Sequence, residues 1–359
     1  MDSDEGELNY HNYQEKAAEV CQKVIEIRKF LPDLIDDVED FCTSDQLALE
    51  PLQEKIKIIS TLSPFPMYQT QMLLNACSSK NITVEIVECI LDVCGRAASH
   101  DNDEEVYPIH IAASNIDCPT SVIELLVEKN PSALEYLSLL DGWMMCDFGS
   151  IKNVKGLPLH FYLTRKALHI DVEVVKRFVY AYPEALTTLL PADNNDFITT
   201  LNALLYHEEI DDLVDVFREL VELNPATVQL RDSDGFTPLH TAAYCLKQIN
   251  PMKEIIQVLL KAWPDGASQL DEDGNLPLHL LCSREYDIKD EGVVLDVIRL
   301  LIDAHLDSLR QINLHGHTPL HQAAVHGSPA LCQLLVNYDS ELVSLLTGSG
   351  KLPIHKACS

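Results

Sequence analysis

A four-residue motif that recurs along the chain constrains the fold more than any other feature of the sequence. It reads Thr-Pro-Leu-His at residues 237–240 and at 318–321. Weaker copies that keep the proline and the histidine lie at residues 107–110, 157–160, 276–279 and 352–355. Proline suits the first position of a helix, because its missing N–H has no intrahelical partner there. Six such helix starts in one chain predict a repeat protein.

A second apolar pattern follows each motif and is more regular than the motif itself. Two adjacent apolar residues are followed four residues later by another pair, as in Val297-Ile298 and Leu301-Ile302. This spacing covers one wide face of an α-helix, which must be buried against neighbours. The pattern also reveals two degenerate repeats, which open at Thr199–Asn202 and at Met72. Seven full repeats and a truncated eighth are therefore predicted, with motif positions at residues 72, 108, 158, 200, 238, 277, 319 and 353.

The motif and its period resemble those of the ankyrin repeat. The resemblance covers residues 67–359 and implies an all-α solenoid of helix-turn-helix units, each followed by a hairpin-like finger. We expect a positive φ in the finger turns at Gly235, Gly274, Gly316 and Gly350, just before the motif. X-Pro steps should end second helices, and they begin at residues 130, 182, 224 and 263.

The chain departs from this family pattern in two ways. Leucine replaces the motif threonine at positions 157, 276 and 352, so the hydroxyl expected to bond the motif histidine is absent there. The finger before Pro158 carries an insertion over residues 137–153. What distinguishes this chain therefore lies between the motifs.

Residues 1–66 precede the repeats and have no recognisable motif. Apolar residues recur at helical spacing over residues 15–31, and a second helix is expected over 47–62. We interpret residues 1–66 as a helical cap on the array at 67–359, because solenoids need a polar end. An independent docking module is the alternative.

Charge and cysteine content limit the functional classes. The chain has 56 acidic and 26 basic residues, a formal charge of −30, which argues against nucleic acid or an anionic membrane as partner and favours a basic protein. The 11 cysteines form no CxxC pair, which indicates a reducing compartment, the cytoplasm with the nucleus as alternative. No stretch has the apolar length of a membrane span, and we expect a monomer. Since the sequence stops inside a first helix, we also expect the natural chain to continue.

The motif histidines invite a metal or catalytic interpretation, which their spacing opposes. Successive layers lie about 10 Å apart, whereas metal ligands lie about 2 Å from the ion. We therefore expect a structural role for His110, His160, His240, His279, His321 and His355. The local cluster His315-Gly316-His317 lacks a cysteine or carboxylate at ligand spacing. Without a phosphate loop or nucleophile motif either, we expect no catalytic residue, cofactor or metal.

Binding is the positive hypothesis, through a concave face built from fingers and first helices. The predicted contact residues are Ser114, Trp143, Met144, Met145, Arg231, Ser233, Phe236, Tyr244, Glu272, Asn275, Leu314, His315, His317, Val325, Ser349 and Lys351. Trp143-Met144-Met145 is the most specific candidate, because aromatic and methionine anchors are enriched at interfaces; the alternative is that it packs on its own array.

The sequence thus predicts a non-catalytic protein-interaction scaffold. One alternative makes the chain the target-recruiting segment of a larger regulatory enzyme or ubiquitin-ligase assembly. Another places a divergent active site in residues 1–66 or 137–153, although either segment is small for a catalytic domain.

Overall fold

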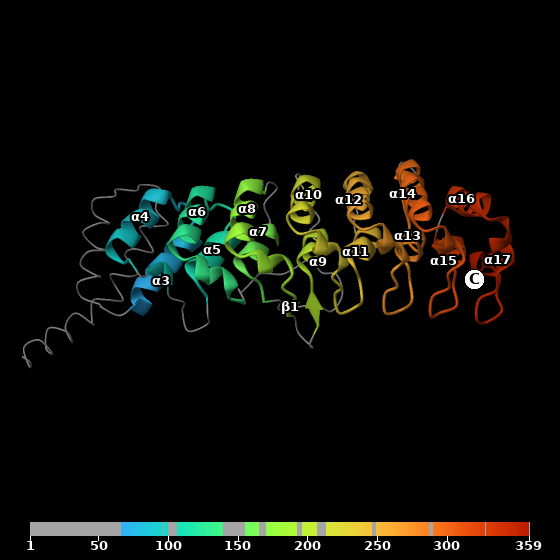
Figure 1. The fold of residues 1–359 in the computed structure, drawn as a ribbon, viewed down its shortest axis with the longest axis horizontal. Helices are drawn as coiled ribbons and strands as arrows, with labels where there is room; N and C mark the ends of the chain where they lie inside the picture. Colours follow the sequence, from blue (N-terminus) through green and yellow to red (C-terminus); the bar gives the residue numbers. More distant parts are fainter. Residues whose placement is uncertain are drawn as a thin grey trace, which may run out of the picture. The chain divides into compact units, whose positions relative to one another are not determined.

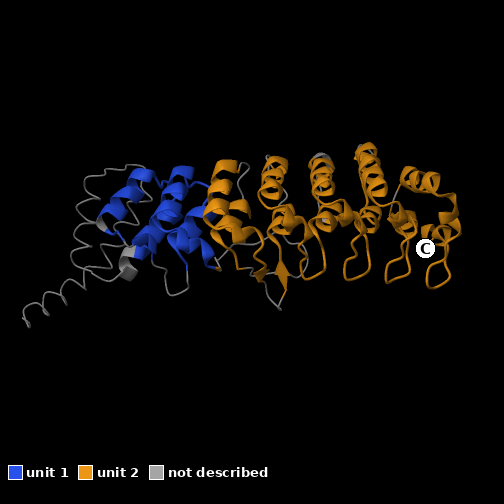
Figure 2. Cartoon of the chain, in the orientation of Figure 1, with its two compact units in different colours: residues 1–136 blue, residues 137–359 orange. Residues whose placement is uncertain are grey.

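The structure is a computed structural model, and its helices are grouped in two compact units. It describes residues 66–95, 97–99, 106–138, 155–164, 170–191, 196–206, 213–245, 249–286, 290–326 and 328–358. The chain divides into residues 1–136 (unit 1) and 137–359 (unit 2) (Figures 1 and 2). The predicted cap over residues 1–66 lies outside the described residues, apart from Pro66, and its boundary stays a prediction. The predicted all-α repeat fold is confirmed.

Unit 1 contains two consecutive helix pairs in its described part. They are α3 (Pro66–Ser78), α4 (Val84–Val93), α5 (Pro108–Ser114) and α6 (Thr120–Lys129). Helix α3 packs on α5, and α4 packs on α6. The prediction that the first repeat opens at Met72 was wrong, because α3 already begins at Pro66. No proline stands at position 72, so nothing prevents the preceding residues from being helical.

Unit 2 repeats the same pairing. Its first helices are α7 (Pro158–Thr164), α9 (Thr200–Leu205), α11 (Pro238–Cys245), α13 (Pro277–Cys282), α15 (Pro319–His326) and α17 (Pro353–Ala357). Its second helices are α8 (Val172–Ala181), α10 (Leu213–Leu223), α12 (Ile249–Ala262), α14 (Glu291–Ala304) and α16 (Pro329–Tyr338). Within the unit, α11 packs on α13, α13 on α15, and α12 on both α10 and α14. First helices thus form one layer and second helices another.

The core lies between these layers, where the apolar pattern predicts it. In α14, Val297, Ile298, Leu301 and Ile302 are all buried. The motif proline, leucine and histidine are buried as well in α13, and so is the small residue Cys282. The motif therefore packs between neighbouring repeats, and its regularity follows from that burial.

Short 3-10 turns follow the second helices and stop them. Trp263 has non-helical backbone angles, φ −150° and ψ 86°, and Pro264 then opens the turn η6 (Pro264–Ser268). Tyr182 before Pro183 and Asn224 before Pro225 behave in the same way. A residue before proline is disfavoured in the helical region, so the X-Pro steps end these helices as predicted. The remaining turns are η1 (Ala97–Ser99), η2 (Pro131–Glu135), η3 (Pro183–Leu186), η5 (Pro225–Gln229), η8 (Leu306–Leu309) and η9 (Ser340–Ser344).

The fingers of unit 2 are hairpin turns that hydrogen-bond to one another. Their turn glycines, Gly235, Gly274, Gly316 and Gly350, all have φ 74°, as the sequence predicts. Backbone bonds join consecutive fingers, from Glu272 N–H to Asp234 O at 3.3 Å and from Leu314 N–H to Asp273 O at 2.9 Å. The longer finger before α9 forms a short antiparallel ladder, β1 (Leu190–Pro191) with β2 (Phe197–Ile198). The fingers are therefore fixed in register by their neighbours.

Candidate functional site

The motif histidines connect each first helix to its own start, and the buried ones also bond toward the next repeat. In every copy Nδ1 accepts the backbone N–H of the residue before the motif proline, at 3.0 Å for His160 and 3.3 Å for His321. The other ring nitrogen then carries the proton and donates. In His240 and His321, Nε2 lies 3.3 Å and 3.2 Å from the carbonyl oxygens of Asn275 and Lys351 in the next finger. One imidazole thus links two repeats.

Replacement of the motif threonine by leucine leaves this connection intact. Where threonine is present, its hydroxyl lies 2.8 Å from Nδ1, as for Thr237 and Thr318. Leu276 has no hydroxyl, but its backbone N–H still donates to His279 at 3.1 Å. The backbone bond is common to all six copies, so the side-chain departure costs only the additional hydroxyl contact.

The degenerate repeat at residues 199–202 keeps the same connection with different chemistry. Asn202 stands where the other repeats have histidine, and its Nδ2 donates to Phe236 O at 3.1 Å. This carbonyl has the same place relative to the next motif proline as Asn275 O has for His240. Thr200 replaces the motif proline and relays the bond of His160 to Ala185 O. An amide therefore substitutes for the imidazole in one layer of the array.

Deep burial keeps the imidazoles of His110, His160, His240 and His279 neutral. Burial lowers the pKa of His110, His240 and His279 from 6.5 to about 4, and that of His160 to about 3. Groups with no exposed surface cannot contact a partner, and their ring nitrogens are occupied inside the molecule. These histidines hold the array together, and the binding surface must be sought among other residues.

Comparing a buried with an exposed copy of the motif tests this structural role. We expect His279→Ala to lower the free energy of unfolding by about 2 kcal/mol, because it removes bonds to Leu276, Gln311 and His317 and leaves a cavity. His355→Ala should lower it by less than about 1 kcal/mol, since His355 is exposed and caps only Leu352. Urea denaturation followed by circular dichroism gives both values. Equal losses would contradict a role that depends on the next finger.

The first residue of each finger organises the turn through its side chain. Asp232 Oδ1 accepts the N–H groups of Asp234 and Phe236, at 3.1 Å and 2.8 Å. Burial raises the pKa of Asp232 to about 6, although these hydrogen bonds and Asn202 act against it. The acidic residues that open fingers therefore serve turn geometry, which leaves the tips themselves for contact.

Most predicted contact residues of unit 2 lie at its surface. Leu314 is 76% exposed, Val325 47% and Tyr244 44%. Glu272, His315, Ser349 and Lys351 are also exposed, whereas Phe236, His317, Ser233, Arg231 and, in unit 1, Ser114 are half-buried. The Phe236 ring meets Tyr244 edge-on, with centroids 5.9 Å apart. Finger and first helix thus form one continuous surface at this repeat.

Three predicted contact residues are engaged inside the array. Asn275 is buried, and it donates to Asp271 at 3.0 Å and accepts from Asn313 at 2.8 Å. Arg231 donates to Leu270 O and to Gln269 in the next repeat, and Ser233 donates to Phe197 O. Asn275 is therefore unsuited to the exposed contact expected of it, because the neighbouring finger covers it. Trp143, Met144 and Met145 lie outside the described residues and stay predictions.

Sequence reasoning missed a row of exposed apolar residues. Leu270 is 41% exposed, Ile312 55% and Leu346 59%, and each stands directly before the first residue of its finger. Arg231 has the same place in the preceding finger, so the aligned register would have found them. We call the set the finger–helix surface and define it as Phe236, Tyr244, Leu270, Ile312, Leu314, Val325 and Leu346.

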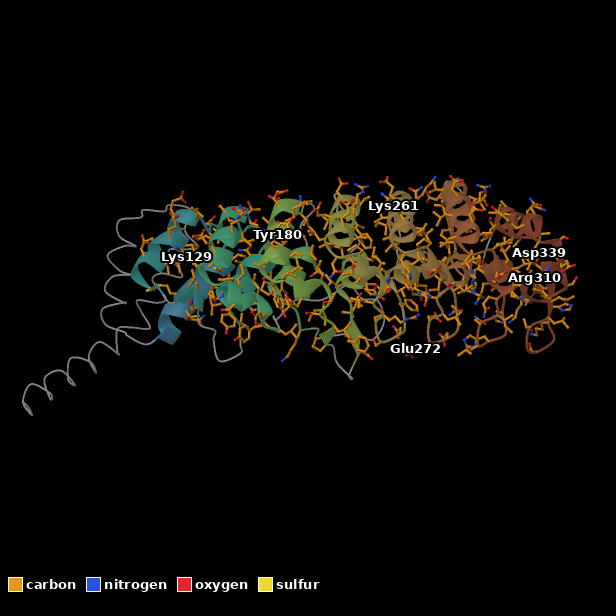
Figure 3. The ribbon with its side chains drawn as sticks, viewed as in Figure 1. Lys129, Tyr180, Lys261, Glu272, Arg310 and Asp339 are labelled. Atoms are coloured by element: carbon orange, nitrogen blue, oxygen red, sulfur yellow. The ribbon has the colours of Figure 1, made fainter. Side chains whose placement is uncertain are left out.

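The opposite side of unit 2 has a different chemistry. Half-buried positions of the second helices carry ion pairs between repeats, such as Lys176–Glu219 at 3.5 Å and Lys253–Asp296 at 2.9 Å. Figure 3 shows Lys261 on this side and Glu272 at a finger tip on the other. Ion pairs that remain in contact with solvent contribute little to stability, so this face is interpreted as a solvated one.

Neither a metal site nor a membrane span is found among the described residues. Within the described ranges, no three His, Cys, Asp or Glu side chains are grouped as a metal site would require. The His317 ring stacks on that of His321 with centroids 6.0 Å apart. Of the helices that the structure describes, none combines the length and apolar character needed to cross a membrane.

Comparison with known protein families gives a match within unit 2. A family model described as ankyrin repeats (3 copies) matches residues 247–345. These residues run from α12 to η9 and contain two of the four positive-φ finger glycines, Gly274 and Gly316. No curated protein matches the chain.

Proposed function

Because this chain is an ankyrin-repeat protein, we propose that it is a non-catalytic scaffold that binds a protein partner through the finger–helix surface. Ankyrin repeats generally mediate protein–protein interactions. The observation that carries the proposal is the exposure of large apolar side chains on consecutive fingers and first helices. Leu314, Ile312 and Leu346 are each more than half exposed on neighbouring fingers. Several large apolar side chains exposed together on neighbouring fingers are a feature of interaction sites.

The charge beside this surface favours a basic partner. Asp196, Asp234 and Asp273 come from three consecutive fingers, and Glu272 is exposed at a tip. Burial, together with Asp196 and Asp273, raises the pKa of Asp234, which indicates that these carboxylates influence one another. A basic segment bound there would relieve this repulsion. The net charge of −30 acts in the same direction over a longer range.

Buried thiols support the proposed reducing, cytoplasmic environment. Cys77, Cys94 and Cys282 are fully buried, and Cys77 and Cys282 occupy positions where other repeats have alanine. Burial raises the pKa of Cys94 to about 11, which makes its thiol unreactive at neutral pH. These cysteines act as small apolar core residues. We further propose that the scaffold is monomeric, because the fold needs no second chain to bury this core.

Position-specific crosslinking tests the proposal. A photoreactive amino acid in place of Leu314 or Tyr244 should crosslink to the partner in the native cell, whereas the same group at Gln257 on α12 should not. Gln257 is exposed on a second helix, so it controls for random contact. The double variant Tyr244→Ala/Leu314→Ala should then weaken binding about tenfold, since apolar anchors dominate interfaces.

Two results would contradict the proposal, one from the crosslinking and one from the affinity of the double variant. Equal crosslinking at Leu314 and Gln257 would show that the partner does not select the finger–helix surface. Unchanged affinity of the double variant, with an unchanged melting temperature, would assign binding to other residues.

A further inference from the structure

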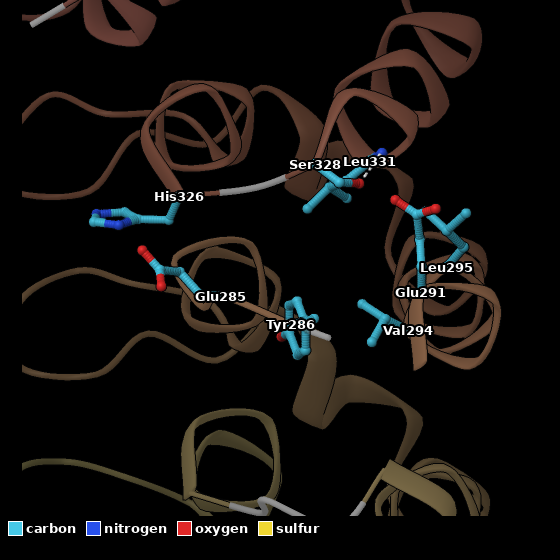
Figure 4. A pocket seen from close by; sticks show the side chains of 8 residues that line it. All are labelled: Glu285, Tyr286, Glu291, Val294, Leu295, His326, Ser328 and Leu331. Atoms are coloured by element: carbon cyan, nitrogen blue, oxygen red, sulfur yellow. Dashed lines mark hydrogen bonds between the residues drawn. The ribbon is translucent and has the colours of Figure 1, made fainter. Parts of the chain in front are cut away.

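A cavity separates two consecutive inter-helix turns of unit 2, away from the finger tips. It has a volume of about 290 Å³. One wall comes from the turn after α13 and the start of α14, and the other from the end of α15 and the start of α16 (Figure 4). Binding sites for whole small molecules usually measure about 300–1,000 Å³. At the lower limit of that range, this cavity has room for one long side chain.

The lining of the cavity combines an apolar middle with acidic ends. Figure 4 shows Glu285 and His326 at one end and Glu291 at the other, with Tyr286 and Val294 between them. Leu295 and Leu331 complete the apolar wall. Arginine and lysine side chains complement this lining, because their aliphatic stem matches the apolar middle and their charged end matches a carboxylate.

The two carboxylates are available to a ligand. Neither Glu285 nor Glu291 forms an ion pair in the part of the chain that the structure describes. Arg284 lies beside the lining, where its guanidinium is 5.3 Å from the centroid of the Tyr286 ring and donates to Ala243 O. Among the described residues that line the cavity, the two carboxylates are the charged groups that a basic side chain could pair with. The ring is held in place because its hydroxyl donates to Leu281 O at 2.6 Å.

We propose that this cavity receives one arginine or lysine side chain from a basic segment of the partner. The stem packs against Tyr286, Val294 and Leu331, and the charged end pairs with Glu285 or Glu291. The site lies at the end of the first helices that carries Val325 and His326, so a segment crossing the finger–helix surface reaches it. The inference rests on the proposed function for its partner, and it adds a specific recognition element outside the fingers.

A fragment experiment tests the cavity without the partner. The full chain, with ¹³C-labelled valine and leucine methyl groups, is titrated with N-acetylarginine amide and with N-acetylcitrulline amide, its neutral isostere. We expect the methyl resonances of Val294, Leu295 and Leu331 to shift with arginine and not with citrulline. Lysine amide forms a third arm, and a response to it identifies which of the two cations fits better.

Matched variants connect the response to the carboxylates. Glu285→Gln/Glu291→Gln should weaken arginine amide binding about tenfold, whereas Glu128→Gln/Glu222→Gln, with the same change in net charge, should not. Glu128 and Glu222 are exposed on other helices. Equal shifts with citrulline, no shift at the three methyl groups, or equal affinity in the two double variants would overturn the inference. Crosslinking at Leu314 is independent of these results, so the two proposals fail separately.

Discussion

Lowering the pH from 7 to 5 should reduce the free energy of unfolding by roughly 2 kcal/mol for each deeply buried motif histidine. Burial holds the pKa of His110, His240 and His279 at about 4, against 6.5 for the exposed imidazole. Below pH 6.5 the histidines are therefore protonated in the unfolded chain while they stay neutral in the native array. The free energy of unfolding is highest above pH 6.5, and it falls with pH until the buried rings are themselves protonated near pH 4.

Finger carboxylates act in the opposite direction, since burial raises the pKa of Asp232, Asp234 and Asp271. The pKa of Asp232 is raised by burial to about 6 from 3.8, so the native state binds its proton first as the pH falls. Between pH 6 and pH 4, protonation of Asp232 therefore raises the free energy of unfolding, whereas the histidines lower it. Because the buried histidines with a lowered pKa outnumber these carboxylates, we expect a net loss of stability. Urea midpoints measured from pH 7 to pH 5 should decrease steadily.

The variant His279→Asn provides the control for the acid effect. Asn202 shows that an amide in this position donates to the equivalent carbonyl, and it does not titrate. We expect the free energy of unfolding of the variant to depend less on pH than that of the natural chain, by the contribution of one buried histidine. A flat or rising stability of the natural chain toward pH 5 would contradict this account, and an unchanged slope in the variant would exclude His279.

Replacing Gly316 by alanine should lower the free energy of unfolding much more than replacing Gly350, although the two glycines have the same φ. A Cβ added to Gly316 would lie 2.5 Å from the backbone nitrogen of Gly348 and 3.1 Å from its Cα. Around Gly350, with the same φ of 74°, no heavy atom lies within 4 Å of such a Cβ. The left-handed backbone costs an alanine about 1–2 kcal/mol, and overpacking adds about 1–3 kcal/mol.

We therefore expect Gly316→Ala to lower the free energy of unfolding by about 3–4 kcal/mol and Gly350→Ala by about 1 kcal/mol. Equilibrium urea denaturation measures both, and circular dichroism at neutral pH checks that the helices are retained. Equal losses would mean that the finger after η9 moves aside at little cost, and that finger contacts do not fix the register of the array.

Local sequence features predicted the repeat because each acts within a few residues. The motif prolines begin helices, the X-Pro steps at Tyr182, Asn224 and Trp263 end them, and the finger glycines have positive φ. Each rule depends on the steric limits of one residue and its neighbour. The predicted start of α3 at Met72 was wrong because position 72 lacks the proline that marks the start of most other first helices.

The predicted contact residues were only partly informative. Tyr244, Leu314 and Val325 are exposed as the pattern suggested, while Asn275 is buried. The burial of Asn275 could not be predicted from its own polar side chain, because the residue that contacts it, Asn313, lies in another repeat. Leu270, Ile312 and Leu346 were missed because an apolar residue beside a finger is assigned to the core by default.

By itself, the sequence determined the helix pairs, their turns and the family, since proline, glycine and apolar spacing restrict the backbone locally. Stacking of repeats within unit 2 decided the rest. It selected the carbonyls that the motif histidines bind, buried Asn275, engaged Arg231 and enclosed the acidic cavity between two turns. These outcomes depend on residues that come from the next repeat along the chain. Such residues meet only when the layers pack, and no local pattern records which of them will face one another.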